Sequence, residues 1–220
     1  MTVLAVVPAR AGSKRLPGKN MKMCAGKPLI QWTIEEAKAC AEIDHILVSS
    51  DDEVTLEFAE CMGVTACKRP KKLARDKTPM MPVLKHALLW AENHWDKKMD
   101  IVVLLQPTSP VRESEFVTHL IRMARAYPLP DDMLAMQTTC GSQPDGQCYI
   151  YCRSALVSPL GFMHWMSFCL SGDYPDINTQ EDFDRAEAIL HSRSRGEPLR
   201  EPEACARVGG CGCGFGRGCS

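Results

Sequence analysis

The stretch VLAVVPARAGSKRLPGKN, residues 3–20, decides the fold of this chain. Its apolar first part, residues 4–8, predicts a buried strand. A loop with two glycines and several cationic side chains follows directly; the cations are Arg10, Lys14, Arg15 and Lys19. In open α/β sheets, ligands bind beyond the carboxyl ends of the strands, which is where this loop begins. We therefore expect the loop to hold a polyanion such as a nucleoside triphosphate.

The spacing within the loop excludes two common phosphate-binding motifs. A Walker A loop has four residues between its glycines and ends in Ser or Thr, whereas here five residues separate Gly12 from Gly18 and the loop ends in Asn20. The dinucleotide fingerprint lacks basic residues and opens straight into a helix. Glycine at both positions frees backbone amides to approach phosphate oxygens. A solvated basic turn remains the alternative interpretation.

Strand and helix patterns alternate along the rest of the chain. Short apolar runs predict strands at residues 45–50, 63–67, 101–105, 133–139 and 148–151, with a turn at 142–146. Helical spacing of apolar side chains predicts helices at residues 29–40, 54–62, 81–94, 113–126 and 179–190. This alternation is typical of a three-layer α/β/α, Rossmann-like domain with a mostly parallel sheet and right-handed crossovers. The aromatic stretch at residues 160–170 is expected to pack against the core.

Composition limits what the chain can do. Its 220 residues suit one domain at residues 1–191, followed by a Gly-, Arg- and Cys-rich tail at 192–220 that we expect to be disordered. A net charge of −1 argues against a broad nucleic-acid surface. The apolar runs are too short to cross a membrane, and the N-terminus has no signal-peptide pattern. We therefore expect no membrane partner and a cytoplasmic location, or a nuclear one in an animal.

The twelve cysteines form two groups. Eight of them lie beside apolar residues and are expected to be small, buried hydrophobic side chains; they are Cys24, Cys40, Cys61, Cys67, Cys140, Cys148, Cys152 and Cys169. The remaining cysteines lie in the tail. Because no CxxC pair occurs in the sequence, we expect no zinc site.

Further polar residues follow the expected strands. Asp51 and Asp52 come after residues 45–50, where the crevice is expected, and for each of them a role in the site and the N-cap of the next helix are equally good interpretations. The run Gln106-Pro107-Thr108-Ser109-Pro110 follows the most apolar strand. Its prolines fix the backbone and its side chains suit a polar ligand, with a simple turn as the alternative. Arg69 follows the third strand and, taken alone, is typical of a surface arginine.

Asp176 and Asn178 form a candidate metal site. Two residues apart on an extended segment, they project to the same side, so a carboxylate and an amide oxygen can share one hard cation. Mg²⁺ that shields a triphosphate suits such a pair. The competing interpretation is a helix-entry turn, which Thr179 as N-cap explains equally well.

Taken together, these motifs resemble those of the acylneuraminate cytidylyltransferases, also called CMP-N-acetylneuraminic acid synthetases. The family pattern PAR-x-GSK-x-x-PGKN matches residues 8–20, VSTDD matches residues 48–52, and RP-x-x-LA-x-D matches residues 69–76. LLQPTSPLR matches residues 104–112 with Val111 in place of Leu, and DIDT-x-EDF matches residues 176–183 with Asn178 in place of the second Asp. The motifs stand in the family order, over most of residues 1–125 and again over about 147–190.

The resemblance implies a nucleotide-diphospho-sugar transferase-like fold and the transfer of CMP from CTP to a 2-keto sugar acid, with pyrophosphate released. It implies nucleotide contacts from Arg10, Gly12, Ser13, Lys14, Lys19, Asn20 and Arg69, of which Arg10, Lys14 and Lys19 are the candidate catalytic residues. It implies sugar contacts from Gln106, Thr108 and Ser109, and Mg²⁺ bound at Asp176 and Asn178. N-acylneuraminate is the first-choice substrate.

Three departures from the family pattern bear on the substrate. Asn178 removes a negative charge, so weaker Mg²⁺ binding is expected. The small residues that follow Asp76 in the family are replaced at residues 77–81, and a short turn between Thr139 and Cys148 replaces several dozen residues that serve dimerisation and sugar binding. This chain thus lacks the segment through which the family usually forms its homodimer. Two alternatives stay open: another sugar nucleotidyltransferase (pseudaminic, legionaminic or Kdo-type), and a non-catalytic nucleotide-binding remnant of the family.

Overall fold

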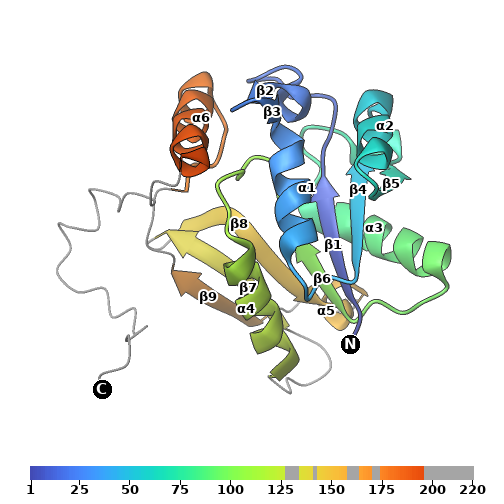
Figure 1. Ribbon diagram of the computed structural model, residues 1–220. Helices are drawn as coiled ribbons and strands as arrows, with labels where there is room; N and C mark the ends of the chain where they lie inside the picture. Colours follow the sequence, from blue (N-terminus) through green and yellow to red (C-terminus); the bar gives the residue numbers. More distant parts are fainter. Residues whose placement is uncertain (127–133, 141–142, 158–163, 170–173, 196–220) are drawn as a thin grey trace, which may run out of the picture.

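The computed structural model describes residues 1–126, 134–140, 143–157, 164–169 and 174–195 (Figure 1). Its main sheet has the strand order β5-β4-β1-β6-β8-β7-β9. The strands of this sheet are β1 (Val3–Pro8), β4 (His45–Ser50), β5 (Thr65–Lys68), β6 (Ile101–Leu104), β7 (Leu134–Cys140), β8 (Gln143–Cys152) and β9 (His164–Cys169). The helices are α1 (Leu29–Ala39), α2 (Glu53–Cys61), α3 (Met80–Trp95), α4 (Ser114–Ala126), α5 (Arg153–Val157) and α6 (Gln180–Ser194). A separate antiparallel hairpin is formed by β2 (Met23–Cys24) and β3 (Lys27–Pro28), each two residues long.

The central strand β1 divides the core into two layers, one on each face of the sheet. Val3, Ala5 and Val7 are fully buried in a cluster that includes apolar residues of α1 and α4. Leu4 and Val6 point to the other face and are fully buried against α3. Because successive side chains of a strand project to opposite faces, an unbroken apolar run is needed where both faces are covered. The predicted three-layer α/β fold is confirmed.

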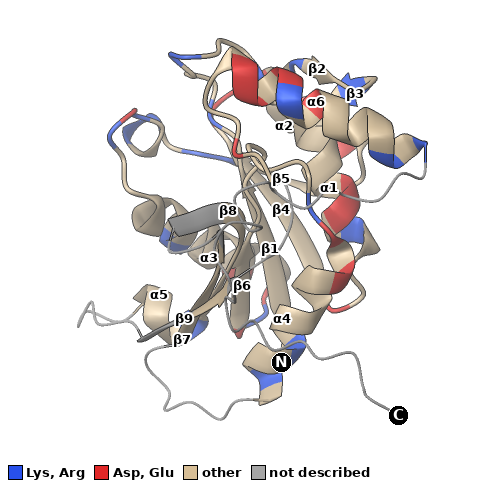
Figure 2. Cartoon of the chain, turned by 90° about the vertical axis from the view of Figure 1, so that its left-hand side faces the viewer, with Lys and Arg blue, Asp and Glu red and all other residues tan. Residues whose placement is uncertain are grey.

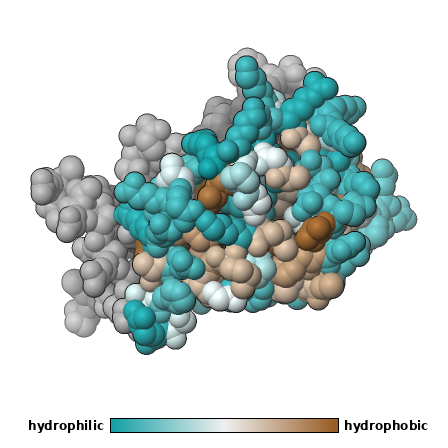
Figure 3. Space-filling view, turned by 90° about the horizontal axis from the view of Figure 1, so that it is seen from above, coloured by the Kyte–Doolittle hydropathy of each residue, from teal (hydrophilic) through white to brown (hydrophobic). Residues whose placement is uncertain are grey.

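The parallel half of the sheet positions the candidate site. β1 pairs in parallel with β4 and β6, and β4 pairs in parallel with β5. Their carboxyl ends therefore meet at one edge, at the top of Figure 1, where the loop after β1 begins. Seen from above, this edge is mainly hydrophilic (Figure 3).

The other half of the sheet departs from the sequence prediction. β8 is antiparallel to both β6 and β7, and it begins at Gln143, so the predicted turn at 142–146 is wrong for its described residues. The register shifts between Gln137 and Thr139, and Gly146 adopts a positive φ of 75° within the strand. Turn-type residues thus occupy an irregular strand. β9 was not predicted; it pairs with β7, and Phe168 packs against the core as expected for its segment.

Helix α6 closes the top of the molecule. Phe183 packs in a third apolar cluster with Leu16 of the loop after β1, Leu29 of α1 and Ile177. Thr179 caps the helix: its side chain accepts from the Asp182 N–H at 3.2 Å, and the Asp182 carboxylate accepts from the Thr179 N–H at 2.8 Å. This capping box fixes the segment before α6. The tail is expected from residue 192, but α6 continues to Ser194, and residues 196–220 lie outside the described part of the chain.

The cysteines and the helices can be compared with what the composition predicts. Cys24, Cys40, Cys67 and Cys148 are buried as predicted, whereas Cys61 is exposed and Cys152 is half-buried. The side chains of the other predicted core cysteines lie outside the described part. Among the described helices, none is long and apolar enough to span a membrane.

Candidate active site

The loop after β1 is held in place by backbone contacts. The Asp51 carboxylate accepts from the Ala11 N–H at 3.0 Å, and the Asn20 side chain donates to the Arg10 carbonyl at 3.1 Å. Gly18 has a φ of 65°, a left-handed conformation that glycine adopts without cost. Gly12 is not in this region, and a Cβ there would meet no atom within 4 Å, so its backbone does not require glycine. Asp52 is the N-cap of α2, accepting from the Thr55 N–H at 3.1 Å.

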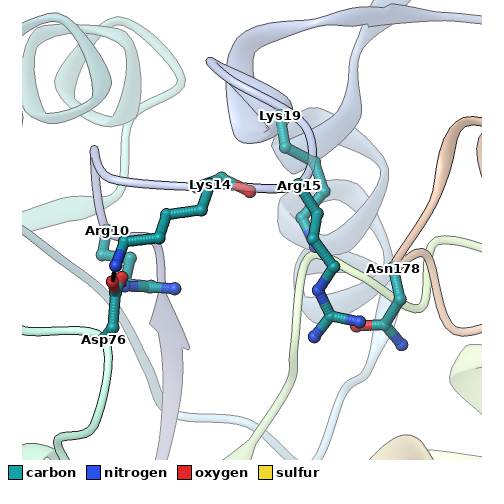
Figure 4. Close-up of a pocket in the computed structure, with 7 residues that line it drawn as sticks. Arg10, Lys14, Arg15, Lys19, Asp76 and Asn178 are labelled. Atoms are coloured by element: carbon teal, nitrogen blue, oxygen red, sulfur yellow. Dashed lines mark hydrogen bonds and ion pairs between the residues drawn. The ribbon is translucent and has the colours of Figure 1, made fainter.

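Two of the loop's cations are paired with one carboxylate. Arg10 and Lys14 both contact Asp76, which lies on the segment between β5 and α3 (Figure 4). Hydrogen bonds from Lys14 and Arg10 hold the pKa of Asp76 below its usual value. All three side chains are at least a third exposed. Exposed pairs of this kind contribute little to stability, so an incoming polyanion can replace Asp76.

Lys19 reaches across the crevice. Its ammonium group donates to the Ile177 carbonyl at 2.6 Å, although the two residues lie far apart in the sequence. Burial lowers the pKa of Lys19, an effect that the negative charge of Asp176 opposes and the positive charge of Arg15 reinforces. Lys19 therefore connects the phosphate-binding loop to the segment that carries the candidate metal ligands.

Two adjoining cavities lie beside the loop. The larger, of about 370 Å³, is lined by Arg10, Ser13, Lys14, Arg15, Lys19, Asp76 and Asn178. The smaller, of about 170 Å³, is lined by Pro8, Arg10, Ser13, Lys19, Asn20, Arg69, Met80, Gln106, Pro107 and Thr108. Arg10, Ser13 and Lys19 line both cavities, so the two form one site with a cationic part and a more neutral part. Figure 2 shows charges of both signs along this edge of the molecule, which fits a local cationic site better than a broad basic face.

The candidate sugar residues do not share one environment. Gln106 and Thr108 line the smaller cavity, and the Thr108 carbonyl accepts from the Ile177 N–H at 2.7 Å. Ser109 is fully buried and lines neither cavity. Gly146 lies against it, because a Cβ at Gly146 would stand only 2.8 Å from Ser109 Oγ. This close approach of β8 excludes Ser109 from direct contact with a ligand in the cavities as they stand.

Arg69 is not a surface arginine. It is 5% exposed, donating to the Ser49 carbonyl at 2.6 Å and to the Ser49 hydroxyl at 3.1 Å. Its side chain still lines the smaller cavity. Burial lowers the pKa of Arg69, and the nearby Asp51 carboxylate opposes that effect.

Arg112 is a residue to which sequence reasoning assigned no role. It is fully buried and donates to the carbonyls of Gln106, at 3.1 Å, and Gln147, and to the Thr33 hydroxyl at 3.3 Å. It therefore joins the chain after β6 to α1 and β8. The only sequence signal was a charge at the end of an otherwise neutral motif.

The candidate metal ligands fit a site with one carboxylate. Asn178 Nδ2 donates to Asp176 Oδ2 at 2.9 Å, so the amide presents its nitrogen to the carboxylate. Asp176 Oδ1 is buried and has no hydrogen-bond partner among the described residues. Within the described part of the chain, no group of three His, Cys, Asp or Glu side chains is placed to hold a metal. A single carboxylate oxygen is still compatible with Mg²⁺, which takes its other ligands from phosphates and water.

The fold and the cationic loop together define a nucleotide-binding α/β protein of the nucleotidyltransferase class. Residues 4–143 match the family model described as cytidylyltransferase. The chain belongs to the cytidylyltransferase family, and the resemblance drawn from its motifs is confirmed.

Relatives differ in how much of their length this chain matches. It is 41% identical over 195 residues to the CMP-N,N′-diacetyllegionaminic acid synthase of Legionella pneumophila, and this alignment covers 88% of this chain and 82% of the relative. It is 38% identical over 125 residues to the N-acylneuraminate cytidylyltransferase of Escherichia coli, but that match spans 57% of this chain and only 28% of the relative.

Solved structures support the fold. A CMP:2-keto-3-deoxy-manno-octonic acid synthetase in complex with CTP aligns with a TM-score of 0.68 at 18% identity, over 88% of this chain and 100% of the other. A cytidylyltransferase from Leptospira borgpetersenii aligns with a TM-score of 0.65 at 19% identity, over 87% of each chain.

Proposed function

We propose that this protein transfers CMP from CTP to a nonulosonic sugar acid and releases pyrophosphate. The observation that carries this proposal is the joint site, in which a cavity lined by the loop's cations adjoins a second cavity lined by Gln106 and Thr108. A triphosphate needs the first kind of surface and a polyhydroxylated sugar needs the second. The family membership of the chain supports the same reaction class.

The reaction joins the two substrates directly. The anomeric hydroxyl oxygen of the sugar acid forms a bond to the α-phosphorus of CTP. The bond from that phosphorus to the oxygen shared with the β-phosphate breaks, its electron pair leaves with pyrophosphate, and the hydroxyl proton is released to solvent. No covalent enzyme intermediate is needed, so positioning and charge neutralisation supply the catalysis.

Each candidate residue has a role in this proposal. Arg10, Lys14 and Lys19 neutralise the triphosphate, with Asp76 displaced from the first two. Ser13, Asn20 and the backbone at Gly12 contact the nucleotide, as does Arg69, which lines the smaller cavity with Ser13 and Asn20. Gln106 and Thr108 hold the sugar.

Mg²⁺ is part of the proposal as the cofactor. Asp176 would hold it after turning from its present position, in which Oδ1 is buried beside Gly146 and the residue lines neither cavity; Asn178, which lines the larger cavity, would either orient Asp176 or turn its amide oxygen inward. The bound ion would withdraw electron density from the phosphates.

The identity of the sugar acid is the finer part of the proposal. N-acylneuraminate remains the first choice, and N,N′-diacetyllegionaminate stands beside it because the relative matched over most of its length is named for that acid. Relatives named for pseudaminic acid and for 3-deoxy-manno-octulosonate extend the panel to be tested.

The test is pyrophosphate release by the purified protein with CTP, Mg²⁺ and each acid in turn. Release that requires CTP and one of these acids supports the proposal. The variant Lys19→Gln should abolish release, whereas Lys85→Gln, an exposed lysine on α3, should leave it unchanged. CTP binding with no release from any acid contradicts transfer and favours a non-catalytic nucleotide-binding protein.

A further inference from the structure

The four cations of the loop after β1 differ in what already binds them. Arg10 and Lys14 contact Asp76, and Lys19 donates to the Ile177 carbonyl. Arg15 is exposed and has neither a hydrogen bond nor an ion pair with any residue that the structure describes. It is therefore the loop cation that a ligand can engage without displacing a protein group.

Arg15 lies at the end of the larger cavity that Asn178 also lines, and it does not line the smaller cavity of Gln106 and Thr108. Its guanidinium extends toward the Asn178 side chain and away from Asp76 (Figure 4). Asn178 follows Ile177, whose N–H donates to the Thr108 carbonyl at 2.7 Å. Arg15 thus faces the segment that is connected to Thr108 through Ile177.

The surroundings of Arg15 leave its charge available. Asn178 is neutral, and its amide nitrogen is directed to Asp176 Oδ2. The acids on either side of Asn178 are engaged elsewhere or point to solvent: Asp176 accepts from the Asn178 amide at 2.9 Å, Glu181 is exposed, and Asp182 accepts from the N–H groups of Asn178 and Thr179 in the capping box of α6. A guanidinium in such a position is suited to bind a carboxylate through two parallel hydrogen bonds.

We propose that Arg15 binds the carboxylate of the sugar acid and thereby selects acids over neutral sugars. The proposal rests on the function proposed above, since it assigns a residue to one group of that substrate. It also divides the loop's charges: Arg10, Lys14 and Lys19 serve the triphosphate, and Arg15 serves the second substrate.

The experiment compares an acid that the protein uses with the methyl ester of the same acid. In Arg15→Gln, kcat/KM for the acid should fall about 10- to 100-fold, while kcat/KM for the ester and KM for CTP stay near wild-type values. Arg15→Lys should recover part of the loss, because it keeps the charge but not the paired donors. Lys14→Gln is the matched control: it should raise KM for CTP and leave the preference for acid over ester unchanged.

Three results would overturn the proposal. An unchanged acid-to-ester ratio in Arg15→Gln removes Arg15 from carboxylate recognition while the transfer reaction itself stands. A rise in KM for CTP alone assigns Arg15 to the phosphates. Should the wild type release no pyrophosphate with any acid, titration calorimetry with a non-hydrolysable CTP analogue decides separately: equal or absent binding of the acids to wild type and Arg15→Gln refutes the role of Arg15. Matching thermal melts confirm that each variant is folded.

Discussion

The buried Arg112 provides the sharpest test of how the sugar side of the site is built. Its guanidinium binds the carbonyls of Gln106 and Gln147 and the hydroxyl of Thr33. These acceptors belong to the chain after β6, to β8 and to α1. The substitution Arg112→Met keeps most of the side-chain volume and removes the donors, so it asks what this connection contributes.

The expected loss can be worked out from the contacts. Hydrogen bonds to a charged group contribute about 1.5–3 kcal/mol each, which for the acceptors of Arg112 sums to at most about 9 kcal/mol. Methionine avoids the cost of burying a guanidinium, several kcal/mol, but removes the Arg112 donors from the carbonyls of Gln106 and Gln147, of which Gln106 keeps the Ser109 N–H at 3.2 Å. We expect a net loss of about 3–5 kcal/mol in the free energy of unfolding, a large part of the stability of a typical domain. The free energy of unfolding of Arg112→Lys should lie between those of the wild type and Arg112→Met, because an ammonium group cannot reach all the acceptors.

Urea denaturation at several pH values measures this loss. Burial raises the pKa of Glu36 above its usual 4.5, and the charge of Arg112 opposes that rise. Without Arg112 the pKa of Glu36 should rise further. The loss in free energy of unfolding caused by Arg112→Met should therefore be smallest below pH 4.5, where Glu36 is protonated in both the folded and the unfolded state. The loss should grow as the pH rises through the raised pKa of Glu36. A deficit below about 1 kcal/mol at neutral pH, or one that does not change with pH, would refute this account of Arg112.

Further predictions concern single contacts of the site. Gly146→Ala should cost about 1–3 kcal/mol in thermal unfolding, because its φ is 75° and its Cβ would stand 2.8 Å from Ser109 Oγ, whereas Gly12→Ala, in open space, should be nearly neutral. Asp76→Asn should tighten CTP binding about two- to five-fold in calorimetry by releasing Arg10 and Lys14; weaker binding would contradict the displacement of Asp76. Because burial lowers the pKa of Lys19, CTP affinity should fall as pH rises through that lowered pKa, and Lys19→Arg should move the fall to higher pH. Asn178→Asp should lower the Mg²⁺ concentration needed for half-maximal activity and raise KM for the sugar acid, since the new carboxylate can pair with Arg15; an unchanged Mg²⁺ dependence would count against a metal at this position.

The parallel half of the fold could be predicted from the sequence because its physics is local. A strand buried on both faces needs an unbroken apolar run, which residues 101–105 supply, and a helix on a sheet needs apolar side chains at helical spacing. The antiparallel half of the sheet has weaker strand patterns in its sequence. β8 contains Pro144, Asp145 and Gly146, which favour turns, and only the pairing of this end of β8 with β7 makes them part of a strand. β9 likewise owes its conformation to pairing with β7.

The candidate site shows the same division between local and distant causes. The loop after β1 was identified from its charge, its glycines and its position after a strand. The burial of Ser109 depends on the approach of Gly146, and the role of Arg112 depends on acceptors in α1 and β8. Contacts of this kind join residues far apart in sequence, so no spacing rule within one motif reveals them.

The loop's cations illustrate why geometry adds to a charge count. In the sequence they are equivalent, whereas the structure gives them different costs of binding an anion. Arg10 and Lys14 must exchange Asp76, at a small cost because these ion pairs are exposed. Lys19 keeps a carbonyl partner and a lowered pKa, and Arg15 exchanges only water. A triphosphate carries enough negative charge to displace Asp76 from Arg10 and Lys14. A single carboxylate binds most favourably to Arg15, because no protein group has to be displaced there. The unequal costs therefore separate the two substrates of the proposed reaction along one short loop.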